Sequence, residues 1–315
     1  MALALLLAAP VAAAAQTGKV YRIGFLGLSS VEDYAENLRA FRQGLRDLGY
    51  EEAKNVSIEY RWAEGRSERL PALAAELVRL KPDVLVTHAA PGIRAARRAT
   101  STIPIVMGAS GDPVRLGFVR SLARPGGNTT GVTSLIFELP AKRLELLREA
   151  VPKLRLVAVL SAGDSGAAKE TETAARTLGV RVSTFNVTWE RASLETAFTA
   201  ILRDRPDALI VIPDPTTTPH HARIVDFATR NRLPTMGGGK DFVAGGGLIS
   251  YGADFKEGWR LAARYVDRIL KGAKPAELPV EQPTRFELAI NLQTAKALGL
   301  TIPRSLLLRA DQITE

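Results

Sequence analysis

LVRLKPDVLVT, Leu77–Thr87, joins the end of an amphipathic helix to a short apolar strand. The segment ILRDRPDALIV, Ile201–Val211, repeats this arrangement, with Arg, Pro, Asp and Leu at matching positions. A second pair of segments follows in the same order, because TIPIV at 102–106 resembles RLPTM at 232–236. Two matches in the same order indicate that the chain contains two copies of one topology.

Strands alternate with helices in both copies. The apolar residues Leu38, Phe41, Leu45 and Leu48 recur at helical spacing, and residues 56–62 alternate as in a half-exposed strand. Strands are expected at 21–28, 56–62, 83–87 and 103–107 in the first copy and at 154–160, 180–187 and 208–212 in the second. This alternation predicts the α/β class, with two lobes that each hold a parallel sheet flanked by helices.

The segment that links the two copies combines an acidic turn with a glycine-rich gap. Asp112 at an N-cap position and Pro113 directly after it predict a helix that ends at Arg124. Gly126–Gly127 supply free backbone dihedral angles, so we expect a hinge there and a crossing to the second lobe over 129–134. Because ligands of parallel α/β sheets bind outside the carboxyl ends of the strands, we expect a ligand cleft between the lobes.

The composition is that of an ordinary globular protein. The 315 residues are 46% apolar and 24% charged, a balance that excludes wholesale disorder. The net charge of +9 comes from scattered Lys and Arg without a basic block, which favours a solvated basic surface over nucleic-acid binding. Cys is absent, which excludes disulfides, thiolate metal sites and a cysteine nucleophile.

Motifs for catalysis, metals and nucleotides are incomplete. GGGKDFVAGGG at 237–247 lacks the Gly-Lys-Ser/Thr ending of a phosphate loop, and GFLGLSS at 24–30 lacks the full dinucleotide fingerprint. Adjacent residues such as His220–His221 point in different directions on a helix, which disfavours a metal site. No Gly-x-Ser-x-Gly nucleophile elbow occurs. We therefore expect a binding module with no catalytic residue, metal or cofactor.

The first sixteen residues have no charge and contain a short apolar core. Ala13–Ala15 before Gln16 fits the small-residue rule for signal-peptide cleavage, although no Lys or Arg precedes the apolar core. We expect 1–16 to be a signal peptide. Because a lipid anchor needs a Cys at the mature terminus, we expect a soluble periplasmic protein.

Four long blocks resemble one family of proteins. They are FRQGLRDLGYEEAKNVSIEYRWAEG, IPIVMGASGDPVRLGFVRSLARPGGNTTGVTS, LPTMGGGKDFVAGGGLISYGADF and FELAINLQTAKALGLTIPRSLLLRAD. The mature chain is similar to the ABC-transporter solute-binding proteins that include the bacterial tryptophan/tyrosine-binding proteins. This resemblance implies a type I periplasmic-binding fold, with two Rossmann-like lobes, three hinge crossings and a small solute held between the lobes. It also implies an ABC permease and its ATPase as partners, and a monomeric protein.

The lobe boundaries expected from this fold are 17–133 plus 252–281 for the first lobe and 134–251 plus 282–315 for the second. The resemblance also implies that loops at the strand ends bind the solute. In the first lobe the matching residues are Ser29, Ser30, His88, Ala89, Ala90, Pro91, Ser110 and Asp112. In the second lobe they are Ser161, Asp164, Ser165, Asp214, Thr216, Lys240 and Asp241. Tyr251 is a further candidate for the pocket lining because of its own position, directly before the second crossing at Gly252.

The solute is expected to bear a carboxylate, because helix N-termini at these strand ends favour anions. His88 and Lys240 would add positive charge if they face inward, and uncapped aspartates could receive an ammonium, which favours an amino acid. The aromatic-amino-acid binders of the family usually have Thr-Pro and Tyr-Asn where this chain has Ala90–Pro91 and Ser161–Ala162. These departures favour an aliphatic or small polar side chain over an aromatic one.

Two other functions use the same cleft. One is an exported α/β enzyme, which turnover of candidate solutes would reveal. The other is a ligand-sensing domain for a membrane receptor, which neighbouring permease genes would distinguish from a transport protein.

Export gives a first testable prediction. N-terminal sequencing of the protein recovered from the periplasm should find a mature terminus near Gln16, because the small residues of Ala13–Ala15 suit cleavage there. Periplasmic protein that still begins at Met1 would contradict the predicted processing.

Overall fold

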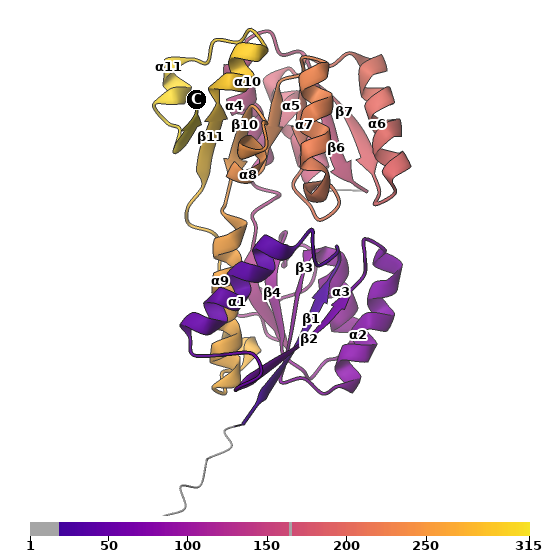
Figure 1. Cartoon of the computed structure of the whole chain (residues 1–315), viewed down its shortest axis with the longest axis vertical. Helices are drawn as coiled ribbons and strands as arrows, with labels where there is room; N and C mark the ends of the chain where they lie inside the picture. The colour runs from indigo at the N-terminus through magenta and orange to yellow at the C-terminus, as the bar shows by residue number, and fades with distance from the viewer. Residues whose placement is uncertain (1–18, 164–165) are drawn as a thin grey trace, which may run out of the picture.

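Two β-sheets, one in each lobe, organise the computed structural model, which describes residues 19–163 and 166–315 (Figure 1). In the described residues the first sheet has the parallel order β2-β1-β3-β4-β5. Its strands are β1 (Tyr21–Gly27), β2 (Val56–Trp62), β3 (Val84–His88), β4 (Ile105–Ser110) and β5 (Thr129–Thr133).

The second sheet has the order β12-β11-β10-β9-β8-β6-β7, in which only β10 and β11 pair antiparallel among the described strands. Its strands are β6 (Leu156–Ala162), β7 (Arg181–Val187), β8 (Ala208–Val211), β9 (Thr235–Gly237), β10 (Ile249–Gly252), β11 (Glu287–Asn291) and β12 (Gln312–Thr314). The predicted α/β fold of two parallel-sheet lobes is therefore confirmed.

Helices cover both faces of the first sheet, because successive strand residues point to opposite sides. Val84 and Val86 of β3 pack with α1 and α9, whereas Leu85 between them packs with α2 and α3. These helices are α1 (Ala35–Asp47), α2 (Leu70–Arg79), α3 (Ala89–Ala99) and α9 (Phe255–Leu270). The sandwich of helix, sheet and helix explains why the strand is apolar along its whole length.

The second sheet is covered in the same way. Val157 and Val159 of β6 pack on one face with α4, α5, α10 and α11, while Ala158 and Leu160 pack on the other with α6, α7 and α8. The helices are α4 (Pro140–Ala150), α5 (Gly166–Leu178), α6 (Arg191–Asp204), α7 (His221–Arg230), α8 (Lys240–Ala244), α10 (Leu292–Ala297) and α11 (Arg304–Leu307). None of the helices within the described ranges is long and apolar enough to cross a membrane.

The repeated Pro-Asp of the sequence has the same structural role in both lobes. The Asp83 carboxylate accepts a 2.8 Å hydrogen bond from the backbone N–H of Arg22, where β1 begins. The Asp207 carboxylate accepts equivalent bonds from Arg155 and Leu156, at 2.8 and 2.9 Å, where β6 begins. Asp83 directly precedes β3 and Asp207 directly precedes β8. Each aspartate therefore joins the start of its own strand to the start of the neighbouring strand, β1 or β6, which gives the repeated Pro-Asp one role in both lobes.

Within the described ranges, the chain passes between the sheets three times: after β5, after β10 and before β11. The second passage sends α9 back to the first lobe, where it packs beside α1 although more than half the chain separates them (Figure 1). The third passage leaves the first lobe at Glu281, which bridges to Val132 of β5. The expected three-crossing arrangement is therefore present.

Two expectations for the linking segment are wrong. Asp112 does accept N-cap hydrogen bonds from Val114 and Arg115, at 2.9 and 3.0 Å, but Gly117 adopts φ 70° and the turn does not continue as a helix. Gly126–Gly127 precede β5, which starts opposite the start of β4, so they lie at the end of the sheet away from the first crossing. They form a turn, and the crossing begins after Thr133.

Gly131 in β5 is the glycine of this segment whose added Cβ would meet backbone atoms most closely. Its φ is 133°, and a Cβ added there would lie 2.3 Å from the carbonyl oxygen of Met107. We expect Gly131→Ala to lower the free energy of unfolding, measured in urea, by about 2 kcal/mol or more. Gly127→Ala is the matched control, because a Cβ at Gly127 meets nothing within 4 Å. Equal stabilities for the two variants would contradict this account of β5.

Candidate functional site

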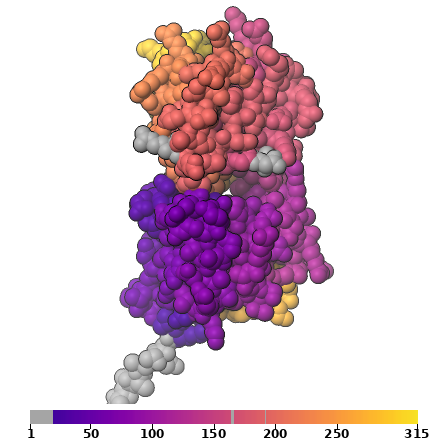
Figure 2. Space-filling view, turned by 90° about the vertical axis from the view of Figure 1, so that its right-hand side faces the viewer, coloured from indigo at the N-terminus to yellow at the C-terminus, as the bar shows by residue number. Residues whose placement is uncertain are grey.

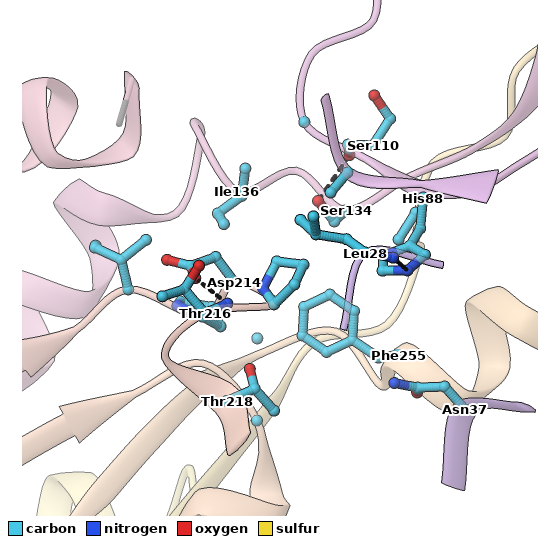
Figure 3. Close-up of a pocket in the computed structure, with 18 of the residues that line it drawn as sticks. Leu28, Asn37, His88, Ser110, Ser134, Ile136, Asp214, Thr216, Thr218 and Phe255 are labelled. Atoms are coloured by element: carbon cyan, nitrogen blue, oxygen red, sulfur yellow. Dashed lines mark hydrogen bonds between the residues drawn. The ribbon is translucent and has the colours of Figure 1, made fainter. Parts of the chain in front are cut away.

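A cleft of about 510 Å³ lies between the lobes, at the carboxyl ends of both sets of parallel strands. Figure 2 shows the two lobes stacked along the long axis and meeting across their facing surfaces. Much of the lining is apolar, and Figure 3 shows Leu28, Ile136 and Phe255 around the cavity from three different segments. The cleft can therefore hold a solute with a large apolar part.

Most of the residues predicted to bind the solute line this cleft. They are Ser29, His88, Ala89, Ala90, Pro91, Ser110, Asp214, Thr216, Lys240 and Asp241. Topology explains this agreement, because the loops after β1, β3, β4, β8 and β9 all end at the same gap. Whether these residues touch a solute stays a prediction.

Four predicted residues do not line the cleft. Ser30 donates a hydrogen bond to Asp33, and Asp112 caps its own turn. Ser161 lies within β6 and donates to Asn186 of β7, because the strand runs two residues further than expected, to Ala162. The side chain of Tyr251 packs on the core of the second lobe and the ring of Phe286. Asp164 and Ser165 lie outside the described residues.

His88 is a neutral structural residue at the back of the cleft. Its ring stacks on Tyr34, with the ring centroids 4.2 Å apart, and meets the Trp259 ring edge-on at 5.9 Å. Its Nε2 accepts a hydrogen bond from the backbone N–H of Leu28 at 3.4 Å. Because the side chain is only 2% exposed, burial lowers the pKa of His88 to about 3. The expectation that His88 adds positive charge to the cleft is therefore wrong.

Lys240 does face the cleft, but carboxylates neutralise its charge. Its ammonium lies 3.3 Å from Asp254 and 3.2 Å from Glu287. The hydrogen bond to Glu287 raises the pKa of Lys240, and burial opposes that shift. Lys256 pairs in the same way with Asp241 at 3.2 Å. Because Asp254 precedes α9 and Glu287 begins β11, Lys240 joins the second and third crossings at the edge of the cleft.

Asp214 connects two strand-end loops of the second lobe. One carboxylate oxygen accepts from the backbone N–H groups of Thr216 and Thr217 at 2.7 and 3.0 Å, and the other accepts from Ala162 at 3.2 Å. Burial raises the pKa of Asp214, and these N–H donors counteract part of that rise. The carboxylate thus holds the loops after β6 and β8 together, and its oxygens already have donors.

Two cleft cations, Arg94 on α3 and Lys256 on α9, were not predicted from the sequence, and Arg94 is the one without a carboxylate partner in the described ranges. Among the described residues no carboxylate lies within ion-pair distance of its guanidinium, which rests over the Phe118 ring at 5.7 Å. Two further cleft residues, Asn37 of α1 and Thr218, have side chains with no hydrogen-bond partner in the part of the chain that the structure describes. Figure 3 shows Asn37 and Thr218 on different sides of the cavity.

The sequence did contain a signal for Arg94 and Asn37. Each is a polar residue one position from the buried face of its amphipathic helix, beside Ile93 and Leu38 respectively. Helical periodicity places such residues outside the core, but it does not say which end of the helix faces the other lobe. Only the packing of the two lobes places both residues at the cleft.

Metal ligands are not clustered here. Within the described ranges, no group of three or more His, Cys, Asp or Glu side chains could hold a metal ion. His221 lines the cleft but lies edge-on to the Phe242 ring at 5.1 Å, and burial lowers its pKa to about 4. Its ring is therefore engaged in packing.

The low pKa of His88 makes the protein sensitive to acid. The unfolded chain takes up this proton near pH 6.5, whereas the folded protein resists it until about pH 3. Above pH 6.5 the histidine is neutral in both states, so the free energy of unfolding is highest there. Between pH 6.5 and about 3 only the unfolded chain binds the proton, and the free energy of unfolding falls by up to about 1.4 kcal/mol per pH unit. Urea unfolding between pH 7.5 and 4 should show this slope, and His88→Asn should reduce it. The less buried His220→Asn is the control, and equal slopes for wild type and His88→Asn would contradict the assignment.

The comparisons with known proteins agree with this geometry. A sequence model of the ABC transporter substrate-binding protein family matches residues 30–314. A tyrosine-binding protein of Clostridioides difficile strain R20291 is 26% identical over 265 residues, which cover 83% of this chain and 76% of that protein.

Solved structures are similar over nearly the whole chain. A conserved domain protein of Vibrio cholerae superposes with a TM-score of 0.86 and 28% identity, covering 94% of this chain and all of that one. An ABC domain from Streptococcus pneumonia in complex with L-Trp gives a TM-score of 0.84 at 27% identity, with the same coverage. Together with the two-lobed fold and its interlobe cleft, these matches show that the chain belongs to the ABC transporter substrate-binding protein family.

Proposed function

We propose that this protein is the periplasmic binding component of an ABC importer and that it captures an amino acid with a bulky apolar side chain. The observation that supports the proposal most is Arg94, the cation of the apolar cleft that the described part of the chain leaves without a carboxylate. A guanidinium in this setting suits the carboxylate of a solute, because the fork of N–H donors matches two oxygens.

The rest of the amino-acid group has partners nearby. Asp33 borders the cleft, and its carboxylate is bonded only to the neighbouring Ser30 among the described side chains, so it can receive an ammonium. The carboxylates of Asp254, Glu287 and Asp241 are occupied by lysines. We therefore place the charged end of the solute near the first lobe, between α1 and α3.

The apolar end then faces the crossing segments. Ile136, Phe137 and Phe255 line this part of the cleft and offer both aliphatic and aromatic surface. The expectation of an aliphatic or small polar side chain in place of an aromatic one rested partly on Ser161, which does not line the cleft. Two relatives, a tyrosine-binding protein and an ABC domain in complex with L-Trp, also support a solute with a large side chain.

Binding is proposed to close the lobes, because a solute that touches both lobes stabilises only the closed arrangement. We place the lobe boundaries at 133/134, 251/252 and 281/282, where the chain passes between the sheets. The closed, solute-loaded monomer would then deliver its cargo to the membrane permease and ATPase. The family relationship favours this binding role over an enzyme that uses the cleft.

Titration calorimetry with L-tyrosine, L-tryptophan and L-leucine, each beside its amide and its decarboxylated amine, tests the proposal. We expect at least one free amino acid to bind, with its amide and amine about tenfold weaker or worse. Arg94→Met should weaken binding of the acid by a similar factor. Arg97→Met is the control, because Arg97 rests over the same Phe118 ring at 5.7 Å but does not line the cleft. Equal affinities for acid and amide would refute the carboxylate site.

A further inference from the structure

A tryptophan of the second lobe rests on a glycine of the first lobe, outside the solute cleft. Trp189 follows β7, and its half-buried indole packs against the first-lobe core cluster that contains Ala63 and Leu70. Gly65 follows β2 and forms the surface beneath the indole. A Cβ added at Gly65 would lie 2.2 Å from Trp189 Cδ2 and 2.4 Å from both Cγ and Cε3. Only glycine leaves room for this contact.

The contact lies at the edges of both sheets, far from the second and third crossings. β2 is an edge strand of the first sheet, at the opposite edge from β5, which leads into the first crossing. β7 is an edge strand of the second sheet, at the opposite edge from β12 (Figure 1). The second and third crossings join β10 and β11, which lie toward the β12 edge. Trp189 therefore bridges the lobes at the side away from the passages about which they turn, where opening separates them most.

A second contact between the lobes lies closer to the first crossing. Arg115 pairs with Glu170 of α5 at 2.8 Å, and its guanidinium lies over the ring of Phe137 at 5.2 Å. Both charged side chains are more than one third exposed, so water and salt screen this pair. The apolar contact of Trp189 is not weakened in that way, which makes it the stronger candidate for holding the lobes together.

We propose that Trp189 and Gly65 form a latch that favours the closed arrangement of the lobes and thereby sets the affinity for the solute without touching it. A binding-competent state that is populated only in part reduces the apparent affinity by that fraction. Loss of the latch lowers the closed population before any solute arrives, so it weakens binding whatever the solute is. The effect on affinity rests on the proposed solute-binding function, whereas the effect on the lobes does not.

Small-angle X-ray scattering of the solute-free protein tests the latch directly. Trp189→Ala removes the indole, and Gly65→Ala places a methyl group against it. Gly49→Ala is the matched control, because Gly49 also lies in the first lobe with a positive φ, 87°, but its added Cβ meets nothing within 4 Å. Both glycine variants thus suffer similar backbone strain, and only one disturbs the latch.

We expect Trp189→Ala and Gly65→Ala to increase the radius of gyration and Gly49→Ala to match wild type, with circular dichroism verifying the fold of each. Acrylamide quenching should also find one more accessible indole in Gly65→Ala, since Trp259 is buried and Trp62 lies in the first lobe. An unchanged radius in either latch variant, or an increase in Gly49→Ala as well, would overturn the proposal.

Calorimetry then measures how tightly wild type and each variant bind L-tryptophan, the probe solute. The latch variants should bind it about threefold more weakly or worse, and Gly49→Ala should bind it like wild type. Equal affinity in all variants would overturn the role of the latch in binding. If wild type does not bind L-tryptophan, that result concerns the identity of the solute, and scattering of the solute-free variants alone decides whether the latch exists.

Discussion

Burial of Trp259 is the interaction on which the geometry of the cleft depends. This residue belongs to α9, which the chain reaches only after completing most of the second lobe, yet it is fully buried in the first. Its ring meets those of Phe25, Phe41 and Tyr34, and Gly108 of β4 leaves the space for it, because a Cβ there would lie 2.3 Å from the indole. The first lobe is therefore complete only when the chain has returned from the second.

This requirement explains why the cleft has a well-defined wall. The same aromatic group includes His88, which is stacked on Tyr34 and bonded to the loop after β1. Asp254 caps the start of α9 by accepting a 2.8 Å bond from the backbone N–H of Lys256, and Lys240 ties that start to β11. The loops at the carboxyl ends of the strands are thus held from behind by packing and from the side by ion pairs.

The charges of the cleft are mostly consumed by these structural pairs, although the whole chain has a net charge of +9. A paired ammonium offers little to an incoming carboxylate, so the surface charge of the protein says nothing about the charge of its solute. Among the described cleft residues, the guanidinium of Arg94 has no carboxylate partner and the carboxylate of Asp33 has no cationic one, so these two groups are available to a solute.

Local sequence signals predicted β1 to β4 and β6 to β8, because the repeated Pro-Asp and the strand periodicity depend on nearby residues. They did not predict β5, which was expected to be a crossing, or the short strands β9 to β12. Asp83 and Asp207 do occupy equivalent positions. The expectations that were wrong depend on residues far away in the sequence. Asp112 and Pro113 begin a turn that Gly117 ends, and the neutral state of His88 follows from rings brought by α1 and α9. Arg94 could not be distinguished from Arg97 until the second lobe was in place.

The central claim is that a solute in this cleft draws the two lobes together. The chain has no Cys, so Ala72→Cys in α2 and Thr196→Cys in α6 give one exposed spin label in each lobe. Distances between the labels should be measured by double electron–electron resonance with and without L-tyrosine or L-tryptophan. The account predicts that the amino acid which raises the melting temperature also increases the short-distance population. A solute that raises the melting temperature at saturation while the distance distribution stays unchanged would contradict it.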